Sequence, residues 1–445
     1  MSRFSLHVLA FSNLLVLTQL SIAWDQGSAA TVSSLSGFQR HFGISSESGA
    51  SSTRNFVSLV YIGNAAGAAL SFLINDRIGR LWSFRLYTFI WIIGQLVAMF
   101  SPGTSGLYAA RIISGLGIGS LSVTGPVSIV EIAPAEIRGL LTAWYSVCMA
   151  IALMVSTFCV YGIELHIATS RLQYQIVWFS PCIFMFLWVV ASFFMSESPR
   201  WLLLAGRDQE AVDTLVTLRR LPPDNPRVQG ELLSIRQSLL AETQSYESND
   251  HSPFQIISIA KETFTVPSNL RRVQQVIIMY ALPQLSGGNT VTNYFIPILE
   301  VVGLAGNSTR NLFLNGMYTM SKFFFTLFAS FFFIDALGRR NSLFFGITLQ
   351  MLSDIYLAVY IKLQQENHVP QAASKAGLAA IFIHALGYAV GKWTEKLQSG
   401  SQCIIDAIQA FSLSHTSLVE SYGPIASAPL VLHYHKHFTG YFTMP

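Results

Sequence analysis

The chain has 445 residues, of which 51% are hydrophobic and only 11% are charged, and its formal net charge at pH 7 is +4. A soluble protein would carry about 25% charged residues, so the composition excludes an ordinary soluble protein and predicts an integral membrane protein. The small net charge gives no reason to expect a nucleic-acid partner.

The first apolar run predicts a membrane helix over residues 6–34. It follows Arg3 and contains a lone acidic residue, Asp25, in the stretch "LSIAWDQGSAAT". A secretory signal peptide is the alternative, because Ser21-Ile22-Ala23 fits a small-x-small cleavage site. We favour a retained helix, because many similar runs follow it and need a first partner.

The remaining apolar runs are also long enough to cross a membrane, which takes about 20 residues in a helix. They predict an all-α membrane protein with a bundle of six helices over 1–196 and a second bundle of about four over 272–393. The runs are 54–75, 84–101, 105–131, 139–163 and 174–196, then 272–300, 310–334, 341–363 and 373–393.

The segment between the two sets, 197–271, has a different composition, with eight basic and ten acidic residues. Its stretches "DQEAVDTLVTLRRL" and "VQGELLSIRQSLLAE" place apolar residues at helical spacing and charges on the other face. This pattern predicts a linker of short amphipathic helices on one membrane surface. A disordered linker is the alternative.

Basic residues in short loops indicate the orientation of the chain. The loops "DRIGR" and "DALGRR" fall on the same side as the charged segment, and the positive-inside rule places that side in the cytoplasm together with the N-terminus. The loop "GNSTRN" then faces outward. Its Asn307 begins an N-x-Ser/Thr sequon and is a candidate glycosylation site.

The same two loops indicate an internal repeat. "DRIGR" begins at Asp76 and "DALGRR" begins at Asp335, 259 residues later, and each follows the second helix of its set. An acid, a glycine turn and a basic cluster at matching places predict two homologous bundles. Two unrelated positive-inside loops are the alternative.

The seventh predicted helix carries neutral polar side chains within an apolar span. The stretch "ALPQLSGGNTVTNYF" contains Gln284, Ser286, Asn289, Asn293 and Tyr294. Amide side chains both donate and accept hydrogen bonds, which suits the hydroxyl groups of a neutral polyol. Hydrogen bonding between helices, with no ligand, is the alternative.

Five motifs, in this order along the chain, resemble the sugar porter family of the major facilitator superfamily. They are "DRIGR", "EIAPAEIRG", "SESPRWLL", "QLSGGNTVTNYF" and "DALGRR". The resemblance covers roughly residues 8–393, and the fungal members that it favours include proton-coupled carriers of hexoses and related acids and polyols. It implies the major facilitator fold, in which two six-helix bundles rock about a central site.

The resemblance also implies a proton-coupling pair. Asp25 matches the acid that takes up the proton in the first helix, and Arg111 of "YAARIISGLGIGS" matches its partner in the fourth. A charge inside the membrane needs a counter-ion or a proton, and arginine keeps its charge, so Asp25 would be the group that titrates. A structural ion pair, or an acid at a wet helix mouth, is the alternative. The glycines after Arg111 predict close helix packing rather than a nucleotide loop.

The resemblance assigns substrate binding to the seventh helix, with one further position in the fifth. The family's paired glutamines correspond here to Pro283 and Gln284, and its tyrosine pair to Asn293 and Tyr294, so an ordinary glucose site is not implied. The candidate binding residues are Gln284, Asn289, Asn293, Tyr294 and Ser146.

Charged residues at the cytoplasmic helix ends match a gate whose salt bridges tie the bundles together in the outward-open state. Solvated positive-inside charges are the alternative. The gate candidates are Asp76, Arg77, Arg80, Glu131, Arg138, Glu197, Arg200, Asp335, Arg339 and Arg340. Asp354, inside the predicted ninth helix, also needs a partner, which the sequence does not name.

The resemblance stops near Lys392. The repeat predicts a counterpart of "EIAPAEIRG" near residues 390–397, yet the chain reads "GKWTEKLQSG" there. Residues 394–445 contain no uncharged run of about 20 apolar residues, so we expect a poorly ordered tail and a C-terminal bundle without its last two helices. A shifted reading frame or a retained intron near residue 392 is the working hypothesis, which sequencing of the transcript tests.

These observations predict a secondary active transporter for a sugar, sugar acid or polyol, working by proton symport as a monomeric multi-pass protein of the plasma membrane. A sugar-sensing receptor without transport, or an inactive truncated product, is the alternative. We expect no enzyme, cofactor or metal site, because no catalytic or metal-ligating constellation falls in an aqueous site.

Overall fold

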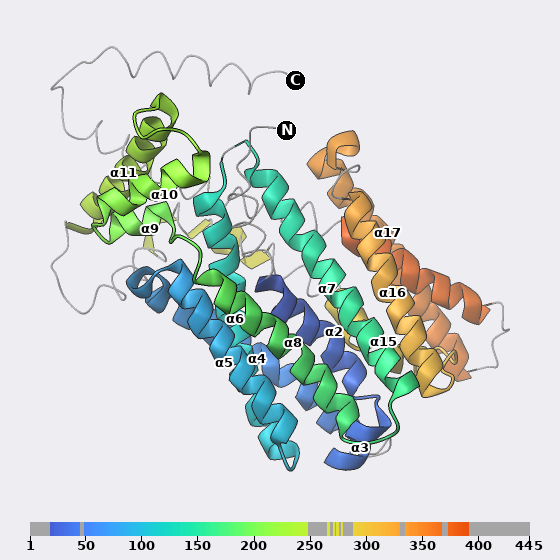
Figure 1. The fold of residues 1–445 in the computed structure, drawn as a ribbon. Helices are drawn as coiled ribbons and strands as arrows, with labels where there is room; N and C mark the ends of the chain where they lie inside the picture. The colour runs from blue at the N-terminus through green and yellow to red at the C-terminus, as the bar shows by residue number, and fades with distance from the viewer. Residues whose placement is uncertain are drawn as a thin grey trace, which may run out of the picture. The chain divides into compact units, whose positions relative to one another are not determined.

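The computed structural model describes most of the chain as helices (Figure 1). The described residues are 18–44, 49–134, 136–247, 265–267, 270–271, 273–275, 277–278, 288–329, 334–366 and 373–390. The chain groups into two compact units, Met1–Asp250 with Gln275–Ser401 and His251–Gln274 with Gln402–Pro445. Only a few helical residues of the second unit are described, so the fold below is that of the first.

The N-terminal part of the first unit consists of long apolar helices and one short one. These are α2 (Thr18–Val32), α3 (Ser36–Phe42), α4 (Gly49–Ile78), α5 (Arg80–Phe100), α6 (Thr104–Ile132), α7 (Arg138–His166) and α8 (Leu172–Ser192). α4 packs along α6, α5 along α6 and α8, and α2 along α7. The triplet Ser21–Ala23, the alternative cleavage site, lies within α2, where Ala23 is fully buried beside Ala152 and Leu153 of α7.

The charged segment folds into helices, as its apolar spacing predicts. They are α9 (Pro199–Leu204), α10 (Asp208–Arg219) and α11 (Pro226–Glu247). Leu215, Val228 and Leu232 form a small buried core between α10 and α11. Contacts that fasten these helices to the bundle include the Trp201 indole, which donates to the carbonyl of Asp76, and the buried Arg219 guanidinium, which donates to the last carbonyl of α6.

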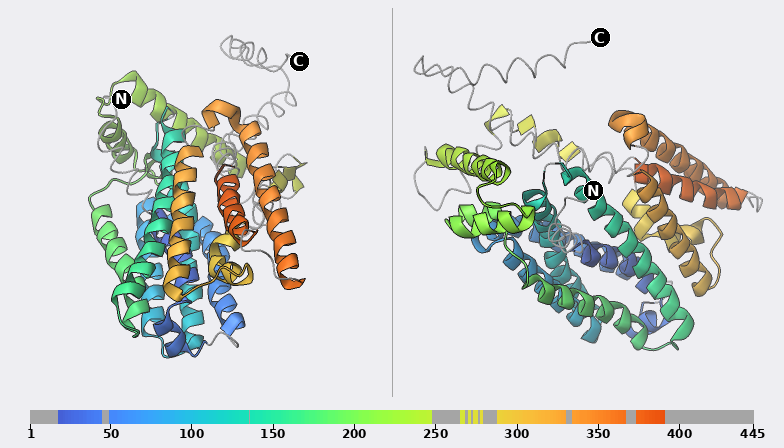
Figure 2. Two further views of the ribbon diagram at one scale, coloured as in Figure 1. Left: turned by 90° about the vertical axis from the view of Figure 1, so that its right-hand side faces the viewer. Right: turned by 45° about the horizontal axis from the view of Figure 1, so that its top comes forward.

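The C-terminal helices of the first unit are α14 (Gly288–Asn293), α15 (Phe295–Val301), α16 (Ser308–Phe328), α17 (Ile334–Glu366) and a helix over Ala373–Val390. α16 runs beside α7 in the views of Figures 1 and 2, so the two parts of the unit meet along this pair. Across it, the hydroxyl groups of Thr157 and Thr319 are 2.7 Å apart.

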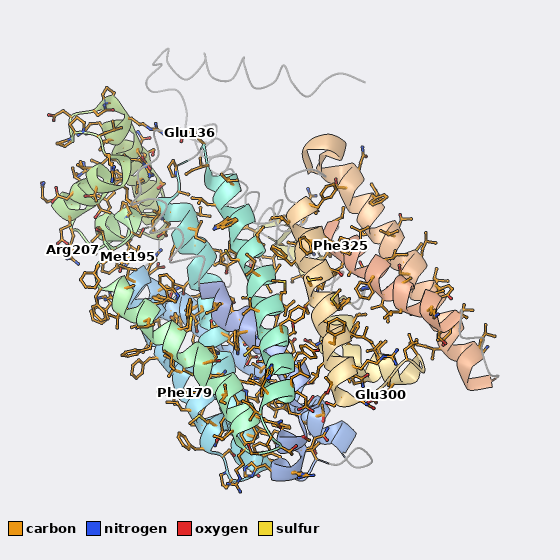
Figure 3. The ribbon with its side chains drawn as sticks, turned by 45° about the vertical axis from the view of Figure 1, so that its right-hand side comes forward. Glu136, Phe179, Met195, Arg207, Glu300 and Phe325 are labelled. Atoms are coloured by element: carbon orange, nitrogen blue, oxygen red, sulfur yellow. The ribbon has the colours of Figure 1, made fainter. Side chains whose placement is uncertain are left out.

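Seven helices of the described chain are long and apolar enough to cross a membrane, which confirms the all-α membrane fold. They are Asn55–Ile78, Arg80–Phe100, Thr104–Ile132, Gly139–His166, Leu172–Ser192, Phe344–Leu363 and Ala373–Val390. Large apolar side chains cover their outer faces, such as Phe179 on α8, while charged residues such as Glu136 and Arg207 lie at the end that carries α9–α11 (Figure 3). This division of apolar and charged surface suits a bilayer.

The glycines that follow Arg111 allow α4 and α6 to touch backbone to backbone. A Cβ atom on Gly115 would lie 2.4 Å from the carbonyl of Val60, and one on Gly119 would lie 2.0 Å from the carbonyl of Asn64. Any side chain there would force the two helices apart. The expected role of these glycines in helix packing is confirmed.

The two copies of the repeat share one backbone conformation at their glycine. Gly79 has φ 93° and ψ 168°, and Gly338 has φ 74° and ψ 160°. Both φ values lie in the region that glycine adopts without strain. Gly79 ends α4 and starts α5 at Arg80, which is why α5 begins before the expected residue 84. Gly338 kinks α17 near its start.

The single helix expected over 272–300 is wrong in its described part, because the chain breaks between α14 and α15. Tyr294 has non-helical dihedral angles, φ −121° and ψ 27°. Pro297 explains the break, since a proline inside a continuous helix would clash with the carbonyl four residues earlier, at Asn293. The break instead places Pro297 in the first turn of α15, where a missing N–H is tolerated.

Candidate functional site

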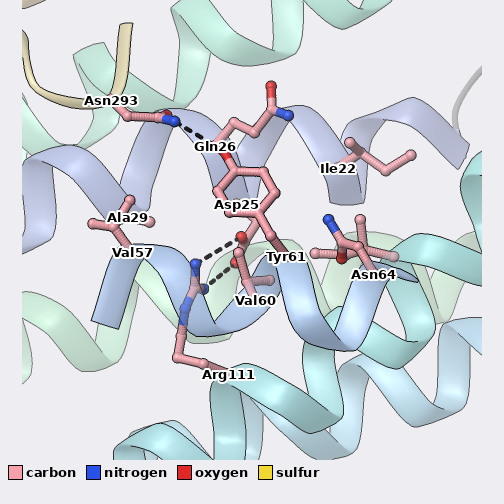
Figure 4. Close-up of a pocket in the computed structure, with 11 residues that line it drawn as sticks. Ile22, Asp25, Gln26, Ala29, Val57, Val60, Tyr61, Asn64, Arg111 and Asn293 are labelled. Carbon is pink, nitrogen blue, oxygen red and sulfur yellow. Dashed lines mark hydrogen bonds and ion pairs between the residues drawn. The ribbon is translucent and has the colours of Figure 1, made fainter. Parts of the chain in front are cut away.

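The centre of the N-terminal bundle holds a buried ion pair between α2 and α6 (Figure 4). The guanidinium of Arg111 contacts both carboxylate oxygens of Asp25, at 2.6 and 3.1 Å. Asp25 is 4% exposed and Arg111 is 3% exposed. The structure therefore places side by side the two residues that the resemblance pairs, and both are buried.

α4 supplies further partners for Arg111. Its Nε donates to the carbonyl of Phe56 at 3.0 Å, and the guanidinium carbon lies 4.7 Å from the centre of the Phe56 ring. A guanidinium has five donors in a planar fork and interacts well with aromatic faces. Arg111 would therefore keep its contacts with Phe56 of α4 when its contact with Asp25 of α2 weakens.

A small pocket opens beside this pair. On its rim, the Asn293 amide of α14 donates to the Tyr61 hydroxyl of α4 at 2.8 Å (Figure 4). This hydrogen bond joins the N-terminal bundle to the seventh-helix segment directly above the ion pair. The pocket is lined by Ile22, Asp25, Gln26, Ala29, Val57, Val60, Tyr61, Asn64, Arg111, Ile118 and Asn293.

The other substrate-binding candidates are placed less completely. Tyr294 is half-buried and packs against the apolar core that includes α3 and α8. Ser146 is buried on α7 but does not line the described pocket. Gln284 and the side chain of Asn289 lie outside the described residues. Of the five candidates, Asn293 alone among those with a described side chain lines the pocket.

Asp354, for which the sequence names no partner, faces a buried histidine. Its carboxylate lies 3.6 Å from Nε2 of His384, which is fully buried and also 3.0 Å from the amide nitrogen of Gln350. These residues come from α17 and the helix Ala373–Val390. His384 is separated from Asp354 by 30 residues of sequence, so only the fold brings them together.

A second cluster of charges lies where α4, α5, α6 and α9 meet. Arg80 contacts Glu131 at 2.7 and 2.9 Å and Asp76 at 2.7 Å. Ser198 donates to Glu131 at 2.7 Å. We call Asp76, Arg80, Glu131, Glu197 and Ser198 the Arg80 cluster. All of these residues belong to the N-terminal half and its charged segment.

Glu197 of the Arg80 cluster caps the N-terminal end of α5. Its carboxylate accepts hydrogen bonds from the backbone N–H groups of Arg80, Leu81 and Ser198, at 3.0–3.1 Å. A carboxylate suits the positive N-terminal end of a helix. Burial nevertheless raises the pKa of Glu197, because removal from water outweighs these hydrogen bonds and the nearby charge of Arg80.

The remaining gate candidates are partly described. Arg77 is exposed in the last turn of α4, and Arg200 is half-buried in the first turn of α9. The side chains of Arg138, Asp335, Arg339 and Arg340 lie outside the described residues. Asn307 is exposed just before α16, as a glycosylated residue must be.

Sequence reasoning missed several residues of these sites. Tyr61 and the carbonyl of Phe56 carry no signal in sequence, because a tyrosine or phenylalanine in an apolar helix is ordinary. Lys322 does carry a signal: it is a lone cation in the apolar run "MYTMSKFFFTLF", and it is 9% exposed. His384 could have been found in the same way.

Comparison with known proteins agrees with this fold. The family model described as sugar (and other) transporter matches residues 12–394. The chain is 28% identical to the quinate permease of Emericella nidulans over 374 residues, 83% of this chain and 69% of that protein. It is 29% identical to the low-affinity glucose transporter HXT1 of Saccharomyces cerevisiae, over 82% of this chain and 62% of the other.

Solved structures show the same architecture. The xylose transporter XylE from E. coli, in a partially occluded inward-open conformation, aligns with a TM-score of 0.69 at 19% identity, over 91% of this chain and 89% of that one. A second structure of XylE, described as a proton:xylose symporter of the major facilitator superfamily and bound to 6-bromo-6-deoxy-D-glucose, aligns with a TM-score of 0.67. The relatives are permeases and transporters, not enzymes. The family match over most of the chain shows that this multi-pass membrane protein belongs to the sugar (and other) transporter family, with the major facilitator fold.

Proposed function

We propose that this protein carries a sugar or sugar-like substrate across a membrane by proton symport with alternating access. The observation that carries the proposal is the buried contact between Asp25 and Arg111 beside the pocket. The named relatives, a quinate permease, a glucose transporter and a proton:xylose symporter, support a polyhydroxylated substrate.

The pair has the properties that coupling requires. Arginine keeps its charge at any physiological pH, so a proton that enters this site goes to Asp25. Protonation removes the attraction to Arg111, which keeps its contacts with Phe56 of α4. The packing of α2 against α4 and α6 would then differ in stability between the protonated and the ionised state of Asp25. This difference would couple proton binding to the opening of the substrate site.

The hydrogen bond at the rim of the pocket could couple substrate binding to the Asp25–Arg111 pair. Asn293 donates to Tyr61, which directly follows Val60 and lies one helical turn after Val57; both valines line the pocket with Asp25. A substrate hydroxyl that replaces this hydrogen bond would separate α14 from α4 and change access to the ion pair. Gln284, Asn289, Tyr294 and Ser146 stay in the proposed binding set, on the family resemblance.

The gate and the organisation of the chain complete the proposal. The Arg80 cluster, with Arg77, Arg138 and Arg200, would form the cytoplasmic gate with its repeat counterparts Asp335, Arg339 and Arg340. The bundles would span 1–196 and 272–393, joined by the cytoplasmic segment 197–271. We place the protein in the plasma membrane as a monomer, with Asn307 on the outer side.

Uptake into proteoliposomes tests this function. The purified protein is reconstituted, the membrane potential is clamped, and a pH gradient is imposed with quinate, D-glucose or D-xylose outside. We expect accumulation of at least one of these substrates, and its loss when an ionophore collapses the gradient. Uptake that is unchanged without the gradient would leave a transporter but remove symport, and absence of uptake for the whole panel would count against transport of this substrate class.

A further inference from the structure

One face of α16 is polar although it is buried. Asn311, Asn315, Thr319, Lys322 and Thr326 recur at intervals of four, four, three and four residues, which places them on one side of a helix. None is more than 9% exposed. Polar side chains on a buried helix face in a membrane protein mark a pathway or site for polar ligands, because they are costly to bury elsewhere.

Lys322 is the charged member of this face. Its ammonium group donates to the Thr292 hydroxyl at 2.7 Å and lies 4.8 Å from the centre of the Tyr388 ring and 5.7 Å from that of Tyr318. These partners come from α14, the helix Ala373–Val390 and α16 itself. Three elements of the C-terminal half therefore converge on one buried cation.

Thr292 connects this cation to the proposed substrate site. It directly precedes Asn293, the residue of α14 that lines the pocket beside Asp25. Lys322 itself lies outside the pocket lining, hydrogen-bonded to the residue next to Asn293, so a ligand that extends from Asn293 past Thr292 would meet a cation on the C-terminal side. The Asp25 carboxylate on the other side is already neutralised by Arg111.

Asn315 supplies a second sign of a ligand. It is 2% exposed, and within the described residues its side-chain oxygen accepts no hydrogen bond. A buried acceptor without a donor is costly, and a ligand hydroxyl would satisfy it. Asn315 lies two helical turns before Lys322, about 10 Å along the helix axis. A polyol with an anionic group at one end has dimensions that suit this arrangement.

We propose that Lys322 selects substrates that carry a carboxylate, so that the protein prefers sugar acids and related hydroxy acids to neutral sugars. This inference rests on the proposed function, since it names the substrate class of that site. A buried ammonium interacts strongly with a carboxylate in a site that excludes water, and a neutral ester or alcohol of the same shape forgoes that interaction.

Binding to the purified protein tests the inference without depending on flux. Thermal stabilisation is titrated with two matched pairs, quinate with methyl quinate and D-galacturonate with D-galactose. We expect the wild type to bind the acid of at least one pair about 30-fold more tightly than its neutral counterpart. Lys322→Met should reduce this ratio to about one, while Lys322→Arg, which keeps the charge, should retain most of it.

Two further variants keep the test decisive. Lys322→Gln retains a donor for Thr292 without the charge, and should lose the preference even if Lys322→Met folds poorly. Lys362→Met removes an exposed lysine of α17 and should leave the ratio unchanged. Equal binding of both members in each pair, no binding of either acid, or an unchanged ratio in Lys322→Gln would overturn the inference. Acid binding without proton-driven uptake would instead uphold it and count against symport.

Discussion

Replacing Asp25 with asparagine tests the role of the proton, because asparagine keeps the shape of the side chain but cannot bind a proton in this pH range. The amide oxygen can still accept one of the two hydrogen bonds that Arg111 gives to Asp25. Breaking a buried ion pair by removing one partner costs about 3–5 kcal/mol. Arg111 keeps its carbonyl and ring contacts with Phe56, so we expect a loss at the low end of that range, about 3 kcal/mol.

The effect on transport is of a different kind. One proton moving down a gradient of one pH unit contributes about 1.4 kcal/mol, which supports about tenfold accumulation of a co-transported substrate at zero membrane potential. Asp25→Asn should lower the accumulation ratio to about one. Exchange of labelled for unlabelled substrate at equal concentrations on both sides needs no proton and should persist.

The assay is reconstituted uptake at clamped potential, with the exposed Asp224→Asn as the matched control. The control should accumulate substrate like the wild type, because Asp224 lies in a turn of the charged segment. The reasoning is refuted by an Asp25→Asn protein that still accumulates substrate about tenfold. Loss of exchange together with accumulation would instead indicate a structural ion pair.

The remaining predictions concern stability, followed by thermal unfolding in detergent. Because burial raises the pKa of Glu197, the folded protein binds a proton there more tightly than the unfolded chain does. This carboxyl therefore stabilises the protein most below its ordinary pKa of about 4.5, and the contribution is lost as the pH rises through the raised pKa. Glu197→Gln should lose less melting temperature than the wild type over that pH window, and parallel curves of melting temperature against pH would contradict this. Gly79→Ala should cost about 1–3 kcal/mol more than Gly338→Ala: both have positive φ, but a Cβ on Gly79 would lie 2.7 Å from the Glu197 carboxylate, whereas no described atom lies within 4 Å at Gly338; equal losses would refute the clash. Arg219→Met should cost about 1–3 kcal/mol, since it leaves the half-buried Glu231 carboxylate and the last carbonyl of α6 without their donor; a loss under about 0.5 kcal/mol would show that this contact is dispensable.

Composition and periodicity were enough to predict the membrane helices and the amphipathic charged segment, because the bilayer requires long apolar runs and the linker requires alternating faces. The break at Tyr294 was not predicted, although its cause, Pro297, is visible in the sequence. The boundary of α5 was also missed, since it depends on the backbone conformation of Gly79.

The site was predictable where a charged or amide side chain stands in an apolar run, as Asn293 does. Asp25 and Arg111 stand out for that reason, and so does Lys322. Partners such as Tyr61, which accepts from Asn293, are ordinary in composition and gain their role from the packing of α4 against α14. The capping role of Glu197 was missed for a similar reason, since an acid at a helix end is compatible with a salt bridge as well as with a cap.

Several contacts hold the charged segment to one half of the molecule, among them the Glu197 cap on α5, the Trp201 indole at the end of α4, and the Arg219 guanidinium at the end of α6. Helices fixed in this way behave as a rigid extension of the half that carries them. In the proposed alternating access, α10 and α11 therefore move together with the first half, as a lever. A protein or lipid that grips this lever would bias the tilt without reaching the pocket.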